Sequence, residues 1–267
     1  MGAYRVGAVV YHERVLRIWA VFAEWFQQRG FPIDPMTFET YDEQMQALLD
    51  GRLDVAWNTN LAYVHVLDAT DGACGALAMR DTDIGWRSLL VVRTDSPART
   101  LADLRGKRVG FGDRDSPQAH LVPVHEMRAD GLDPAVDLVA SRLDRDVGKH
   151  GDTGGAELAQ LARLRAGELD GAVCSNLVFN AIAQLGNDED LRVVWRSPPF
   201  NHCNFTVLDD AADAHAEFAR LLVSMDAADP KLCEPMELEG VNRWVPFDPT
   251  GYASIIAAVR GGPVIVG

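Results

Sequence analysis

Several features that would place a chain in a familiar class are absent or scarce in this sequence. No apolar run reaches the roughly 18 residues that a membrane-spanning helix needs, so membrane insertion is not expected. The four cysteines, Cys74, Cys174, Cys203 and Cys233, form no CxxC pair and are too few for a disulfide scaffold. Basic residues are also scarce, with 25 Lys and Arg against 39 Asp and Glu. The resulting net charge of −14 repels phosphate backbones and argues against nucleic acid as a partner.

Motifs for nucleotide binding and for serine hydrolysis are incomplete. Gly110-Phe-Gly112 lacks the third glycine of a dinucleotide fingerprint, because position 115 is Asp. The sequence also holds no GKS/T phosphate loop and no GxSxG. A small anionic ligand remains compatible with the acidic composition, because helix N-termini act locally while bulk charge is screened beyond about 10 Å.

What the chain does contain is a repeated segment. Residues 51–60 (GRLDVAWNTN) and 167–176 (GELDGAVCSN) share Gly, Leu, Asp, Ala and Asn at the same places. In both copies an amphipathic helical run leads through the glycine into a short apolar strand, and the strand ends at an Asn that we expect to cap the next helix. The 267 residues suit two α/β lobes of roughly 100 to 150 residues each, so the sequence predicts two similar lobes.

The pattern of strands and helices predicts how the chain divides between the lobes. Short strand-like runs alternate with helical runs such as the one with apolar Val15, Ile18, Trp19, Phe22, Trp25 and Phe26, which is typical of a largely parallel sheet. We expect lobe one to hold residues 1–93 and 200–267, and lobe two residues 94–199. Two crossings between lobes would form a hinge around a closing cleft.

Ligand-binding residues are predicted from the loops that follow the strands. In open α/β sheets, ligands bind beyond the carboxyl ends of the strands. The polar residues that this rule selects as ligand contacts are Tyr11, Asn58, Thr59, Asn60, Ser116, Gln118 and Asn176.

Histidines on or beside the same loops are candidates for chemistry. His12, His120 and His202, with Glu13, could act as general acids or bases, and the histidines could equally donate hydrogen bonds to a bound anion or be structural. The same four residues could form a dispersed site for zinc or iron, although no HExxH or facial-triad sequence frames it.

Other reactive residues have simpler interpretations. Cys203 could be a nucleophile, but adjacent residues in an extended segment point in opposite directions, so at most one of His202 and Cys203 would face the cleft. We expect Cys174 and Cys203 to be packing residues, and His65, His150 and His215 to be surface or packing residues.

Five segments resemble one family over most of the chain. They are residues 41–45 (YDEQM), 51–57 (GRLDVAW) with Ala62-Tyr63, 86–93 (WRSLLVVR) with Ser96, 101–113 (LADLRGKRVGFGD) and 191–199 (LRVVWRSPP). In these segments the chain resembles the substrate-binding proteins of phosphonate, phosphate and phosphite ABC transporters, and residues 101–113 are the most specific match. The resemblance implies the two-lobed type 2 periplasmic-binding fold and a small anionic ligand.

The chain departs from that family where the family usually carries a Ser-Thr-Ser cluster at a helix start. This chain has Ser116-Pro117-Gln118 there, so one hydroxyl remains, with Gln118 and His120 as the other polar groups. Fewer hydroxyls weaken the support for a tetrahedral phosphonate and favour a planar carboxylate or a mixed polar ligand.

Two functions are consistent with these observations. The first is a protein that closes on a small polar, anionic molecule without chemistry. The second is a cytoplasmic enzyme on the same scaffold, as in the chorismate dehydratase of menaquinone synthesis, the fungal thiamin-pyrimidine synthase and dihydroxyphthalate decarboxylase, to which the resemblance also extends. Such an enzyme would use His and Glu for elimination, hydrolysis or decarboxylation.

Location and partners follow from the same alternatives. The sequence starts at Met1 without a recognisable leader, and the cysteine usage fits a reducing compartment, so we expect a cytoplasmic protein. If a leader has been removed, the location would be periplasmic and an ABC permease would be the expected partner.

Overall fold

The computed structural model describes residues 2–208 and 213–261 and shows two compact units. Unit 1 comprises residues 1–84 and 201–250, and unit 2 comprises residues 85–200 and 251–267. The predicted boundaries differ at residues 85–93, 200 and 251–267, which were assigned to the first lobe and lie in unit 2. The C-terminal difference arises because α10 (Ala253–Arg260) packs on α4 (Val122–Ala129). The chain therefore passes between the units three times rather than twice.

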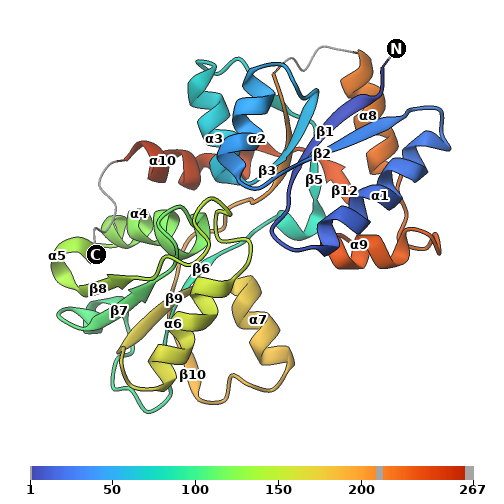
Figure 1. Cartoon of the computed structure of the whole chain (residues 1–267). Helices are drawn as coiled ribbons and strands as arrows, with labels where there is room; N and C mark the ends of the chain where they lie inside the picture. The colour runs from blue at the N-terminus through green and yellow to red at the C-terminus, as the bar shows by residue number, and fades with distance from the viewer. Residues whose placement is uncertain (1, 209–212, 262–267) are drawn as a thin grey trace. The chain divides into compact units, whose positions relative to one another are not determined.

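Unit 1 is a mixed five-stranded sheet with helices on both faces (Figure 1). The strand order is β2-β1-β3-β11-β4, in which β1 pairs in parallel with β2 and β3, while β11 pairs antiparallel with β3 and β4. The elements of the sheet and its helices are β1 (Tyr4–Val9), α1 (Arg14–Gln27), β2 (Ile33–Phe38), α2 (Tyr41–Leu49), β3 (Val55–Asn58), α3 (Asn60–Ala69), β4 (Gly75–Ala76), β11 (Asn204–Val207), α8 (Asp213–Val223) and α9 (Cys233–Glu239). A separate antiparallel pair joins β5 (Ala78–Arg80) to β12 (Trp244–Pro246).

Two apolar layers hold unit 1 together. On one face, the predicted stripe of α1 is buried and packs with Phe218 of α8 and Met236 of α9. On the other face, Tyr41, Met45 and Leu48 of α2 pack with α3. Burying each such side chain contributes about 1.5 to 3 kcal/mol, so the amphipathic spacing read from the sequence is sufficient to fix both faces.

Unit 2 repeats this plan. Its sheet has the order β10-β6-β9-β7-β8, in which β7 is parallel to β8 and β9, and β6 is antiparallel to β9 and β10. The helix α4 covers one face, while α6 and α7 cover the other. The elements not yet defined are β6 (Ser88–Arg93), β7 (Arg108–Phe111), the π-helix η3 (Pro117–Leu121), α5 (Pro134–Asp137), β8 (Val139–Arg142), α6 (Gly155–Arg165), β9 (Gly171–Ser175), α7 (Asn176–Gln184) and β10 (Leu191–Arg196). Among the described helices, none is long and apolar enough to span a bilayer.

The sequence repeat corresponds to the same ion pair in both units. Arg5 of β1 donates to Asp54 at 2.7 and 3.0 Å and to the Gly51 carbonyl at 2.8 Å. Arg108 of β7 donates to Asp170 at 3.0 and 3.1 Å and to the Gly167 carbonyl at 3.2 Å. In each unit, the Gly-x-Leu-Asp turn therefore binds the arginine of one parallel strand, β1 in unit 1 and β7 in unit 2.

The leucine of the repeat has an equally specific position. A methyl group on Gly7 would lie 2.5 Å from the Leu53 Cδ1 atom, and one on Gly110 would lie 2.6 Å from the Leu169 Cδ1 atom. Only glycine leaves room for this approach in β1 and in β7. The shared sequence Arg-Val-Gly at residues 5–7 and 108–110 was a second sign of the repeat that our reading of the sequence missed.

The predicted helix caps are wrong by one residue. Thr59 and Ser175 are the N-caps, since their side chains accept from the backbone N–H groups of Ala62 and Val178 at 3.2 Å. Asn60 and Asn176 are the first helical residues. Their side chains are therefore available for other contacts.

Candidate functional site

In unit 1, the predicted residues Asn58, Thr59 and Asn60 lie where β3 passes into α3, and all three are buried. Asn58 Oδ1 accepts from Gln44 Nε2 at 2.8 Å, and Asn60 Nδ2 donates to the Asn201 carbonyl at 2.9 Å. The remaining polar atoms, Asn58 Nδ2 and Asn60 Oδ1, are buried without a hydrogen-bond partner. An unsatisfied buried amide costs about 1 to 3 kcal/mol, which is unusual enough to indicate a binding position.

His202 belongs to a different group in unit 1. Its Nδ1 atom lies 3.0 Å from the Cys203 Sγ atom and 3.9 Å from an Asp83 carboxylate oxygen. Both side chains of the His202-Cys203 pair are buried together, so our expectation that they point in opposite directions was wrong. The reason is that β11 begins only at Asn204, and the alternation of a strand does not extend to these two residues.

The Asp83-His202-Cys203 group has the spacing of a metal site but not its electrostatics. The three potential ligand atoms lie within 4.8 Å of one another. However, Arg80 donates to both oxygens of Asp83 at 2.6 and 2.7 Å and places a positive charge beside them. Burial, together with the Arg80 charge, lowers the pKa of His202 to about 3, so this imidazole is neutral. We interpret the group as a buried ion pair with a neutral histidine, because a divalent cation would have to displace the guanidinium.

The other predicted residues of unit 1 form no catalytic arrangement among the described residues. His12 is exposed, and its Nδ1 atom accepts from the backbone N–H of Arg14 at 3.2 Å. Glu13 is exposed at the start of α1 and makes no capping bond with its side chain. Tyr11 is half-buried against the core. Of the residues proposed for acid-base or metal chemistry, His202 thus groups with Asp83 and Cys203 rather than with His12 or Glu13.

In unit 2, Ser116, Gln118 and His120 lie together in the turn of η3, and all three are buried. Ser116 caps this π-helix by accepting from the Ala119 N–H at 3.2 Å. His120 Nδ1 lies 3.0 Å from the Arg114 carbonyl, and its Nε2 atom is buried without a partner. Burial lowers the pKa of His120 to about 4, so it is neutral and suited to hydrogen bonding rather than to proton transfer near pH 7. Single π-helical turns occur frequently at functional sites.

Glu157 is a member of this cluster that our reading of the sequence did not select. Its Oε2 atom accepts from the Ser175 backbone N–H at 2.6 Å and from the Ser175 hydroxyl at 2.9 Å, and the Gln118 side chain also hydrogen-bonds to it. Burial raises the pKa of Glu157 to about 7. The sequence did indicate that Glu157 is buried, because it falls on the same helical face as Leu161 and Leu164, at i+4 and i+7.

His150 and Gly151 are two further residues that lie against this cluster. His150, assigned above to the surface or to packing, is buried and has a φ of 52°, a conformation that is uncommon for a residue other than glycine. A methyl group on Gly151 would lie 2.5 Å from both Ser116 Oγ and Gln118 Nε2. The backbone of this loop therefore lies directly against the two ligand candidates.

Two aspartates hold that loop in place. Asp113 Oδ1 accepts from the backbone N–H groups of Arg145 and Asp146 at 2.5 and 2.9 Å, and Asp115 Oδ2 accepts from the Gly148 N–H at 2.5 Å. The acidic residues before Ser116 thus have a structural role, which is to bring residues 145–151 against η3.

Asn176, the last predicted residue of unit 2, is hydrogen-bonded to the backbone of Arg87. Its Oδ1 atom accepts from the Arg87 N–H at 2.7 Å, and its own N–H donates to the Arg87 carbonyl at 2.9 Å. Asn176 therefore fixes the start of β6 beside the N-terminus of α7.

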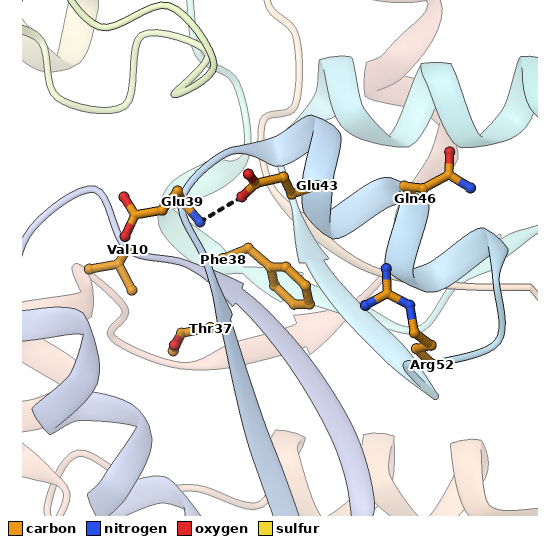
Figure 2. Close-up of a pocket in the computed structure, with 7 residues that line it drawn as sticks. All are labelled: Val10, Thr37, Phe38, Glu39, Glu43, Gln46 and Arg52. Carbon is orange, nitrogen blue, oxygen red and sulfur yellow. Dashed lines mark hydrogen bonds between the residues drawn. The ribbon is translucent and has the colours of Figure 1, made fainter.

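Two hollows within the units lie away from these residues. Figure 2 shows one in unit 1, of about 450 Å³, with Phe38 on one side and Arg52 and Gln46 on the other. Its polar groups already have partners, since Glu43 accepts from the backbone N–H of Glu39 and Arg52 pairs with Asp50 at 3.5 Å. A hollow of about 480 Å³ in unit 2 lies between α6 and α7. Neither contains a predicted site residue.

Comparison with known proteins agrees with this fold. The profile of the family described as "ABC transporter, phosphonate, periplasmic substrate-binding protein" matches residues 8–252. The chain belongs to this family. The likeness seen in the five sequence segments is thereby confirmed, and the family is one of periplasmic substrate-binding proteins.

Individual relatives are distant. The phosphonates-binding periplasmic protein of Escherichia coli (strain K12) is 27% identical over 190 residues, which cover 67% of this chain and 52% of that protein. The match therefore spans about half of the length of this relative.

Among solved structures, XAC2383 from Xanthomonas citri bound to ATP has a TM-score of 0.75 and 20% identity over 98% of each chain. PhnD1 from Prochlorococcus marinus (MIT 9301) in complex with methylphosphonate has a TM-score of 0.72 and 16% identity over 97% of each chain. At these identities the likeness shows the fold alone, and it confirms the predicted two-lobed type 2 periplasmic-binding fold.

Proposed function

We propose that this chain is a substrate-binding protein for a small anionic molecule, and that the buried polar cluster of unit 2 makes the main contacts with it. The cluster comprises Ser116, Gln118, the His150-Gly151 backbone and Ser175. Family membership supports the anionic ligand class. The observation that carries the assignment of the site is the joint burial of Ser116 and Gln118 against Gly151, because this places hydroxyl, amide and backbone groups at one helix start.

The composition of this cluster favours a ligand with planar acceptor oxygens. Ser116 is the one hydroxyl of the Ser-Pro-Gln segment, and Pro117 has no N–H to donate. A tetrahedral phosphonate has three oxygens to satisfy, whereas a carboxylate has two in one plane. We infer that carboxylates compete well with phosphonates at this site.

In unit 1, Asn58 and Asn60 are the proposed ligand contacts. This proposal rests on the partnerless atoms Asn58 Nδ2 and Asn60 Oδ1, a donor and an acceptor on neighbouring residues. Such a pair suits a polar substituent that can both donate and accept.

The enzymatic alternative has no support from the comparisons. Buried His120 and His202 are both neutral, which makes them poor acid-base groups near pH 7.

Calorimetric titration of the full chain with methylphosphonate, inorganic phosphate, malonate and methanesulfonate tests the proposal. We expect binding of at least one probe, weakened tenfold or more by Ser116→Ala and by Gln118→Leu. Ser96→Ala is the matched control, because Ser96 also accepts a backbone N–H in a loop of unit 2, from Ala98 at 3.3 Å. Absence of binding by all four probes, or equal loss in the control, would contradict the proposal.

An ABC permease is the partner that family membership favours, and a periplasmic location accompanies it. We propose both for this chain. Detection of the mature chain in a periplasmic extract of the source organism would support the location, and its exclusive recovery with cytoplasmic markers would oppose it.

A further inference from the structure

Glu157 joins three elements of the proposed ligand site. It lies on α6, it binds Ser175 at the N-terminus of α7, and it binds the side chain of Gln118 in η3. Glu157, Ser175 and Gln118 are each at most 2% exposed. Because Gln118 also contacts the Gly151 backbone, the carboxyl group lies one side chain away from the proposed position of the ligand.

The surroundings of Glu157 contain hydrogen-bond donors and negative charge. Its three donors, the Ser175 N–H, the Ser175 hydroxyl and the Gln118 side chain, are all neutral. The negative charge of Asp113 also raises the pKa of Glu157, which disfavours ionisation. Burial of this kind keeps a carboxyl group protonated at much higher pH than in water.

Titratable groups on the packed elements do not offset this charge. On β9 the only one is Cys174, whose pKa is raised by burial and by Glu157. The α7 segment NLVFNAIAQ contains none. Arg93 of β6 and Arg108 of β7 are paired with Asp95 and Asp170.

On the loops around α6, Asp146 lies beside Gly155 and Asp115 binds the Gly148 N–H, so both add negative charge. The same loop also carries two cations, Arg145 and Lys149. His120 of η3 adds no charge, because burial lowers its pKa to about 4. An anion that enters this region therefore adds its charge to those of Asp113, Asp115 and Asp146.

We propose that Glu157 couples ligand binding to protonation: the site accepts an anion together with one proton from solvent, which resides on the Glu157 carboxyl group and is released when the ligand leaves. The inference rests on the proposed function of the Ser116 and Gln118 cluster. Its physical basis is that a second buried negative charge beside an ionised Glu157 is unfavourable, whereas a neutral Glu157 removes the repulsion.

Protonation also changes the hydrogen bonding of Gln118. A protonated carboxyl group has lost acceptor capacity, so it cannot hold all three donors equally well. The Ser175 N–H is fixed by the start of α7, whereas the Gln118 side chain can turn. A Gln118 amide that donates less to Glu157 can donate to the ligand instead, which links the proton to the affinity of the site.

Calorimetry of the full chain in buffers of different ionisation enthalpy measures the proton taken up for each ligand bound. The probe is whichever of methylphosphonate, phosphate, malonate and methanesulfonate binds. At pH 8 we expect the unmodified chain to take up close to one proton more than Glu157→Gln. Its Kd should increase by up to tenfold for each pH unit above 7, relative to this variant. Comparison with Glu157→Gln cancels the titration of the probe itself.

Glu168→Gln is the matched control, because Glu168 is an exposed glutamate of unit 2 that is paired with Arg163. It should behave as the unmodified chain. Equal proton uptake and parallel pH profiles for the unmodified chain and Glu157→Gln would overturn the inference and leave the proposed function intact. Absence of binding by every probe from pH 5.5 to 8.5 would overturn both.

If Glu157→Gln does not fold, carbon-13 NMR of the glutamate carboxyl groups in the unmodified chain replaces it. The titration midpoint of Glu157 should move to higher pH on addition of the probe that binds. An unchanged midpoint would overturn the inference.

Discussion

The stability of this protein between pH 5 and pH 8 is expected to reflect two opposing effects of buried groups. Burial raises the pKa of Glu157 to about 7, and it lowers the pKa of His120 to about 4 and that of His202 to about 3. In the unfolded chain the three groups return to their ordinary values. Each difference makes the free energy of unfolding depend on pH.

The signs of the two effects follow from which state holds more protons. Above pH 4.5 the unfolded chain loses the Glu157 proton while the folded chain retains it, so stability falls as pH rises and levels off above about 7. Below pH 6.5 the unfolded chain takes up a proton on each histidine that the folded chain does not, so stability falls as pH decreases.

The magnitudes nearly cancel. From pH 8 to pH 5 each histidine removes about 2 kcal/mol, because pH 5 lies about 1.5 units below its unfolded pKa and one unit is worth about 1.4 kcal/mol. Over the same range Glu157 contributes about 3 kcal/mol, since its effect develops over the two units below 7. The unmodified chain should therefore lose only about 1 kcal/mol, whereas Glu157→Gln should lose about 4 kcal/mol.

Urea unfolding at pH 5, 6, 7 and 8 measures this difference. Glu168→Gln serves as the control and should follow the unmodified chain. Parallel curves for the unmodified chain and Glu157→Gln, or a loss of about 4 kcal/mol in both, would refute the reasoning.

Three further outcomes are expected from the fold. Gly110→Ala should destabilise the chain by about 1 to 3 kcal/mol in urea, because its methyl group meets Leu169, while Gly2→Ala has no neighbour within 4 Å and should change stability by less than about 0.5 kcal/mol. Asn60→Leu should weaken binding of the active probe tenfold or more and should lower stability only by the lost hydrogen bond to the Asn201 carbonyl, about 0.5 to 1.5 kcal/mol, whereas a loss of stability with binding unchanged would assign Asn60 a structural role. Ending the chain at residue 250 should destabilise unit 2 and expose the face of α4 that α10 covers, which increased binding of a hydrophobic dye would report.

The apolar periodicity and the positions of glycine and proline predicted most of the helices and strands correctly. The stripe of α1 and the positions of β3 and β9 followed from apolar spacing, because burial of a helical stripe or a short strand needs no long-range information. The apolar spacing did not predict that the C-terminal helix α10 packs on unit 2. The contact between α10 and α4 depends on two helical faces about 130 residues apart, and a local pattern does not specify its partner.

The candidate site was predictable in part for a similar reason. Asn58, Asn60, Ser116 and Gln118 were selected because they follow strands, which is a topological rule, and they remain predicted ligand contacts. Glu157 and His150 were missed because their importance comes from contacts with distant segments, Ser175 for one and the Gly151 turn beside Ser116 for the other. Each had a local sign in the sequence: Glu157 is a charged residue on an apolar helical face, and His150 is a histidine beside a glycine-rich turn.

The position of β11 has a consequence for synthesis. In the sheet of unit 1 this strand lies between β3 and β4, yet it is formed by residues 204–207, about 130 residues after β4 in the chain. All five strands of the second sheet leave the ribosome before it does. At 5 to 20 residues per second, the N-terminal segment must wait roughly 6 to 26 s for its missing strand. The sheet of unit 2 can thus form before the sheet of unit 1 is complete. During that interval the edges of β3 and β4 are unpaired, and a chaperone that binds them would protect the chain from aggregation.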